Sequence, residues 1–84
     1  MACYLEIKFY GANEPWQRNP NPFPTKEAAF RAGLDFCCER QPDPKVKAEM
    51  WQLTRDKRFA PETKNVTCRV VDESGASLIP VFSI

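Results

Sequence analysis

The stretch that decides the fold is residues 3–10, CYLEIKFY, in which apolar and polar side chains alternate. Cys3, Leu5, Ile7 and Phe9 fall on one side of an extended chain, and the intervening residues fall on the other. A period of two that is rich in aromatic side chains is typical of a half-buried β-strand. The sequence therefore predicts a strand close to the N-terminus.

The next two segments predict a loop followed by a helix. Residues 13–24, NEPWQRNPNPFP, hold four prolines and no periodicity, which favours an extended loop without regular structure. Thr25 suits a helix N-cap and Pro42 stops a helix, so we expect a helix from Thr25 to about Gln41. The residues expected to share its buried arc are Ala29, Phe30, Gly33, Leu34, Phe36 and Cys37.

A second helix is predicted over residues 44–55. Asp43 followed by Pro44 is a helix start signal, and Val46 and Met50 then recur at helical spacing. A strand over residues 48–53 is the alternative, because apolar and charged residues alternate there.

The C-terminal part predicts a β-hairpin. Residues 66–71 favour a strand, Asp72 to Gly75 a tight turn, and residues 76–84 a final strand. Pro80 has no backbone N–H, so it marks an edge strand or a bulge. The expected fold is a single α+β domain over residues 1–84, with element order β-α-α-β-β. Its three-stranded antiparallel sheet would carry one or two helices packed against it.

Composition and charge exclude several classes of protein. The chain is 43% hydrophobic and 27% charged, which is ordinary for a folded domain, and its net charge of +1 gives no general attraction to nucleic acid or membranes. Residues 45–69 are more basic, with seven Lys or Arg against three Asp or Glu. No uncharged run approaches the roughly 18 residues of a membrane span. Glu6 and Lys8 interrupt the N-terminal apolar run, so no signal peptide is expected and we place the chain in the cytoplasm.

The sequence offers no catalytic or metal-binding motif, and we expect neither enzymatic activity nor a cofactor. Histidine, the most common general base and metal ligand, is absent. Cys3, Cys37, Cys38 and Cys68 lack the paired spacing of a zinc site. In the cytoplasm they are expected to be free thiols, with Cys38 exposed and the other three acting as small core residues.

Aromatic and basic side chains are the candidates for binding a partner. The residues expected to contribute are Tyr4, Tyr10, Trp16, Arg18, Trp51, Arg55, Lys57 and Arg58. The basic run at residues 55–58 suits a nucleic acid, although a solvated helix end is the favoured reading of it. The face of the sheet that bears Tyr4, Tyr10, Val71, Ile79 and Val81 is either an exposed patch or is covered by the second helix. Covering is the favoured alternative.

Three segments carry a resemblance to small proteins of phages and prophages, anti-CRISPRs included. They are the strand at Tyr4–Tyr10, the helix start at Thr25–Ala28 and the hairpin at Arg69–Gly75. The resemblance implies an inhibitor or modulator that binds a bacterial host protein complex. The alternatives are a nucleic-acid-binding accessory protein that uses the basic segment 45–69, and a homodimeric structural module; the chain itself is expected to be a monomer or a homodimer.

Overall fold

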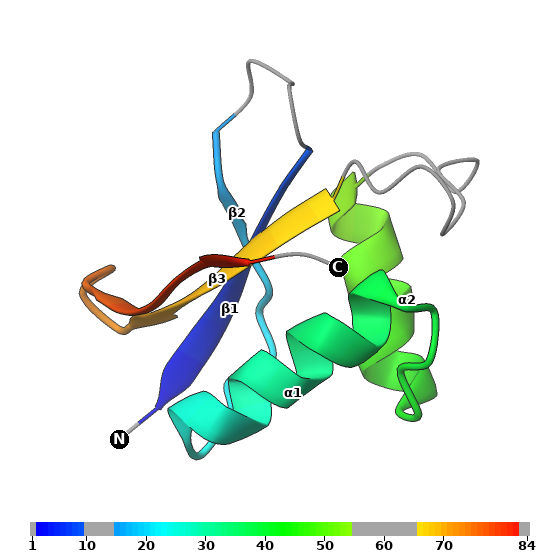
Figure 1. The fold of residues 1–84 in the computed structure, drawn as a ribbon, viewed down its shortest axis with the longest axis horizontal. Helices are drawn as coiled ribbons and strands as arrows, with labels where there is room; N and C mark the ends of the chain where they lie inside the picture. Colours follow the sequence, from blue (N-terminus) through cyan, green and yellow to red (C-terminus); the bar gives the residue numbers. More distant parts are fainter. Residues whose placement is uncertain (1, 10–14, 55–65, 83–84) are drawn as a thin grey trace.

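In the computed structural model, which describes residues 2–9, 15–54 and 66–82, two helices pack against a four-stranded antiparallel sheet (Figure 1). The elements are β1 (Cys3–Phe9), β2 (Gln17–Arg18), α1 (Lys26–Cys37), α2 (Pro44–Thr54), β3 (Val66–Asp72) and β4 (Ser77–Phe82). The predicted α+β class and the predicted order of the main elements are confirmed.

The sheet has the strand order β2-β1-β3-β4, so β1 and β3 form its centre. The β1–β3 register runs without interruption from Cys3 opposite Asp72 to Phe9 opposite Val66. The fourth strand, β2, lies in the segment predicted to be a loop and pairs Arg18 with Glu6. Two residues between prolines cannot show a period of two, which is why the alternation pattern misses this strand.

Helix α1 begins as predicted and ends earlier than predicted. The Thr25 hydroxyl accepts a hydrogen bond from the Ala28 N–H at 3.1 Å, which is N-capping geometry. At the other end, Glu39 adopts φ = 60°, and the Arg40 N–H donates to the Asp35 carbonyl at 2.6 Å. This Schellman arrangement ends the helix at Cys37, before Pro42 can.

Residues 44–54 form a helix, so the strand alternative for residues 48–53 is wrong. The Asp43 carboxylate accepts hydrogen bonds from the Lys45 and Val46 N–H groups, at 2.9 and 3.4 Å. This cap and the buried positions of Val46 and Met50 fix the helical phase of α2.

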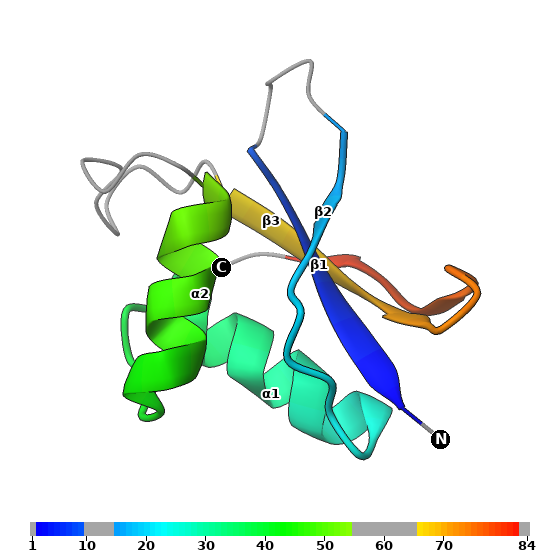
Figure 2. The same cartoon turned by 180° about the vertical axis from the view of Figure 1, so that it is seen from behind.

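Both helices lie on the same side of the sheet, as the two opposite views show (Figures 1 and 2). Val46 and Met50 of α2 belong to the same buried cluster as Leu5 and Ile7 of β1. The prediction that α2 covers the second face of the sheet is therefore wrong. Helix α1 contacts β1, β3 and β4, and α2 contacts β1, so both helices share this face of the sheet.

The buried arc of α1 is rotated slightly from the predicted one. Ala29, Ala32, Gly33 and Phe36 are buried, whereas Leu34, which was expected in the core, is half-buried. Gly33 permits this close approach, because a Cβ at that position would lie 2.8 Å from Phe82 Cζ. The small residues thus face the sheet.

The C-terminal hairpin forms as predicted. Gly75 adopts φ = 91° in the turn, and its N–H donates to the Asp72 carbonyl at 3.0 Å. Pro80 lies in β4, which is an edge strand with irregular pairing to β3. Neither α1 nor α2, the two helices in the described ranges, combines the length and apolar content needed to cross a membrane.

Candidate partner-binding face

The side of the sheet opposite the helices, which we call the open face, is polar and aromatic. Its positions follow from the register, because residues directly opposite each other in antiparallel strands point to the same side. The described residues that form the open face are Tyr4, Glu6, Lys8, Trp16, Arg18, Thr67, Arg69 and Val71.

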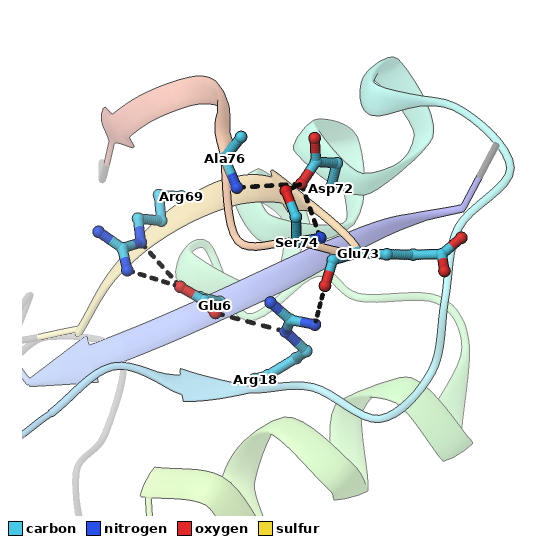
Figure 3. Close-up of polar contacts among 7 residues, drawn as sticks. All are labelled: Glu6, Arg18, Arg69, Asp72, Glu73, Ser74 and Ala76. Atoms are coloured by element: carbon cyan, nitrogen blue, oxygen red, sulfur yellow. Dashed lines mark hydrogen bonds and ion pairs between the residues drawn. The ribbon is translucent and has the colours of Figure 1, made fainter.

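Glu6 lies at the centre of the open face between two arginines. Arg18 on β2 and Arg69 on β3 are its direct cross-strand neighbours. Arg69 Nε and Nη2 lie 2.8 and 2.7 Å from Glu6 Oε1, and Arg18 Nε lies 3.4 Å from Oε2 (Figure 3). Arg18 also donates from Nη1 to the Glu73 carbonyl at 3.3 Å, which ties it to the hairpin turn. One carboxylate thereby orients two guanidinium groups.

Among the described residues of the open face, the rings of Tyr4 and Trp16 each lie against at least one cationic side chain. The Arg69 guanidinium carbon lies 4.3 Å from the centroid of the Trp16 ring, and Lys8 Nζ lies 5.8 Å from it. The Arg18 guanidinium carbon lies 4.8 Å from the Tyr4 ring centroid. These distances are those of cation–π contacts, which favour planar guanidinium groups on aromatic faces.

These long side chains form a thin layer over the sheet. Glu6, Thr67 and Val71 on the open face are all buried, although they lie outside the cluster that both described helices share with the sheet. Thr67 also donates from its hydroxyl to the Lys8 carbonyl at 3.1 Å. The outer surface of this layer is formed by charged and aromatic groups, since the side chains of Arg18 and Arg69 are 34% and 31% exposed.

The structure brings together three of the residues predicted to bind a partner and separates a fourth from them. Tyr4, Trp16 and Arg18 all lie on the open face, where Arg18 contacts the Tyr4 ring and Trp16 contacts Lys8 and Arg69. Trp51 lies on the helix side of the sheet, where its ring packs 5.1 Å from that of Phe36. The remaining predicted residues, Tyr10, Arg55, Lys57 and Arg58, lie outside the described residues.

Sequence reasoning missed Glu6, Lys8 and Arg69 as members of this site. The alternation in residues 3–10 does place Glu6 and Lys8 on the side of Tyr4. Arg69 could be assigned to the site only from the register of β1 against β3, because it lies 63 residues from Glu6 in the sequence. A register cannot be read from a single strand pattern.

The cysteines lie on the helix side and are all unbridged. Cys3 and Cys68 are buried as expected, whereas Cys37 and Cys38 are both half-buried, so the expectation that Cys38 is exposed and Cys37 is buried is wrong. Cys38 is the C-cap of α1, and its N–H donates to the Leu34 carbonyl at 3.0 Å. The Sγ atoms of Cys37 and Cys68 lie 4.0 Å apart, and hydrogen bonding to Cys37 together with burial raises the pKa of Cys68 well above its ordinary value.

The hairpin turn beside Arg18 is organised by Asp72. Its carboxylate accepts hydrogen bonds from the Ser74 hydroxyl at 2.6 Å, the Ser74 N–H at 2.9 Å and the Ala76 N–H at 3.0 Å (Figure 3). These bonds, the Ser74 hydroxyl first, lower the pKa of Asp72. The described residues contain no group of three or more Cys, Asp or Glu side chains placed to hold a metal ion.

Comparison with protein-family models, with curated proteins and with solved structures finds no match to this chain. The functional argument therefore depends on the open face itself.

Proposed function

We propose that this chain is a non-enzymatic binding protein and that the open face is the surface that binds its partner. One observation carries the proposal: Tyr4, Trp16, Arg18 and Arg69 lie together on that face. Tyr, Trp and Arg are the residue types most enriched among the side chains that dominate binding energy at protein interfaces. A protein partner therefore fits this face best.

The resemblance to phage and prophage accessory proteins supplies the proposed context. In this proposal the chain acts in the cytoplasm of a bacterial host and inhibits or modulates a host protein complex by covering part of its surface. Occlusion of that kind needs a small folded domain with one binding face. The link to that class is an analogy of element order, and the open face is the physical argument.

The proposal assigns no catalytic step to the chain. Among the described residues, Cys68 and Asp72 have a clearly shifted pKa, and each shift follows from contacts that hold the fold together. Cys68 is buried against Cys37, and Asp72 binds the N–H groups of its own turn.

A nucleic-acid accessory role is the second candidate. Arg69, the last residue of the basic segment 45–69, favours it, because its side chain is 31% exposed on the open face, where a phosphate could bind it.

The protein-partner proposal is tested by affinity capture from a lysate of the bacterium in which the gene is found. Wild type is compared with Trp16→Ala and Arg18→Gln, and with Lys45→Gln, which removes a charge from an exposed position in α2. We expect wild type and Lys45→Gln to retain the same protein, and the two open-face variants to lose it while keeping their circular dichroism spectra. Capture that survives both open-face substitutions would refute the assignment of this face.

A further inference from the structure

The guanidinium groups of the open face keep donors that Glu6 does not use. Each guanidinium has five N–H donors. Arg69 directs Nε and Nη2 toward Glu6, whereas Arg18 directs Nε toward Glu6 and Nη1 toward the Glu73 carbonyl. Each arginine therefore retains N–H groups that can bind a carboxylate of another molecule, and its orientation is already fixed by Glu6 and by an aromatic ring.

We infer that the partner of the open face is an acidic protein segment whose carboxylates bind Arg18 and Arg69. This inference rests on the proposed function and adds the chemistry of the partner. It follows from charge complementarity, which selects partners and sets the salt dependence of binding.

The open face presents positive charge to its surroundings. Among the described residues it holds the cations Lys8, Arg18 and Arg69 and one carboxylate, that of Glu6. The Glu6 side chain is only 11% exposed, whereas those of Arg18 and Arg69 are 34% and 31% exposed.

The acidic residues of the adjacent turn do not cancel this charge at the face. Asp72 is directly opposite Cys3 in the register, so its carboxylate, which binds Ser74 and Ala76, leaves β3 on the side away from the open face. Glu73 contributes its carbonyl to Arg18, and its carboxylate points away from the Glu6 cluster (Figure 3). A carboxylate complements the positive charge and the unused N–H donors of Arg18 and Arg69.

The same contacts argue against a nucleic acid as the partner. A single strand binds such a surface by stacking its bases on aromatic rings. Here a cation already lies over the Trp16 ring and another over the Tyr4 ring, so a base would have to displace it. The net charge of +1 also supplies no general attraction for a polyanion, whereas local pairing with carboxylates needs none.

The test uses three probes on the isotopically labelled protein, followed by NMR. The first is a short peptide of alternating Glu and Ser, the second is the same peptide with every Glu replaced by Gln, and the third is oligo(dT). We expect the Glu peptide alone to shift the signals of β1, β2 and β3 residues on the open face. Arg18→Gln should weaken its binding by about tenfold or more, while Lys45→Gln, of equal net charge, should leave binding unchanged.

A second variant guards against a loss of binding that reflects disturbed structure. Arg69→Lys keeps the positive charge but removes the planar guanidinium with its paired N–H donors. It should therefore weaken binding of the Glu peptide, while the spectrum of the variant remains that of a folded protein. Equal shifts from the Gln peptide would overturn the acidic-segment inference and leave a protein-binding face in place. If oligo(dT) shifts these signals and the peptides do not, both the acidic-segment inference and the proposal of a protein partner would be overturned. If no probe shifts the open face, the inference falls, and lysate capture separately decides the proposed function.

Discussion

Two nitrogen atoms of the Arg69 guanidinium lie close to Oε1 of Glu6, Nε at 2.8 Å and Nη2 at 2.7 Å. The two residues occupy directly paired positions of β3 and β1. Arg18, on the other side of Glu6, makes a single contact at 3.4 Å. Because the Glu6 side chain is only 11% exposed, the closer arginine should contribute more to stability.

We therefore predict that Arg69→Ala lowers the free energy of unfolding by about 1–3 kcal/mol, the range for hydrogen bonds to charged groups and for a buried group left unpaired. Arg18→Ala should lower the free energy of unfolding by a smaller amount. Urea melts would measure both. Glu6→Gln is the control, because with the charge removed the Arg69→Ala penalty should shrink in a double-mutant cycle. Equal penalties for the two arginines, unaltered by Glu6→Gln, would contradict the proposed role of Glu6.

The thiol of Cys68 should make stability depend on pH in the alkaline range. Its folded pKa is raised, so above an unfolded pKa of about 8.5 the unfolded chain loses a proton that the folded chain retains. The unfolded state then binds fewer protons, and the stability contributed by this thiol falls as pH rises. The free energy of unfolding would be measured against pH for wild type and for Cys68→Ala. The difference between the two curves should show the loss of stability that this thiol causes.

Timed alkylation checks the same environment. Cys37 and Cys38 are half-buried, so they should react before Cys3 and Cys68, which are buried. Cys68 reacting as fast as Cys38 in the native state would be inconsistent with this packing.

Asp72 should show the opposite pH dependence. Its pKa is lowered by the Ser74 hydroxyl and by N–H groups of the turn, so its contribution is present above the unfolded pKa of about 3.9. That contribution is lost as pH falls through the folded pKa. Asp72→Ala should lower the urea midpoint at neutral pH, and the difference from wild type should narrow in acid. A difference that stays constant from neutral pH to strong acid would mean that the carboxylate charge has no part in holding the turn.

Glu39 occupies the C′ position after α1 with φ = 60°, a conformation that costs a non-glycine residue about 1–2 kcal/mol. Its ion pair with Lys47, at 3.2 Å, contributes only about 0–1 kcal/mol to stability. Glu39→Gly should therefore stabilise the domain by up to about 1 kcal/mol in thermal or urea melts. Glu39→Ala, which loses the ion pair and keeps the strain, is the matched control and should be less stable than the glycine variant. The reverse order would show that the ion pair outweighs the backbone strain.

Local signals in the sequence predicted what local interactions determine. The caps at Thr25 and Asp43 and the turn at Gly75 involve neighbours within four residues, so their hydrogen bonds follow from residue type and spacing. The end of α1 was missed because Glu39 adopts a conformation that glycine normally supplies. The half-buried position of Leu34 was missed because the small residues Ala29, Ala32 and Gly33 face the sheet, and helical periodicity favours the larger apolar side chains for that arc.

The candidate site was only partly predictable, since it depends on pairing between distant segments. Tyr4, Trp16 and Arg18 were identified by residue type, and only the register brings them together. Trp51 has the same aromatic character but lies beside Phe36 on the opposite side of the sheet. Residue type thus suggested candidates, and the strand order decided which of them share a surface.

The two tryptophans, one on each side of the sheet, allow a direct test of the claim that the open face binds the partner. Trp51→Phe leaves Trp16 as the single reporter on the open face, and Trp16→Phe leaves Trp51 as the reporter beside Phe36. Each variant would be titrated with the protein recovered by lysate capture while tryptophan emission is followed. A saturable change in Trp16 emission, with Trp51 emission unchanged, is the predicted result; a change confined to Trp51 would contradict the account.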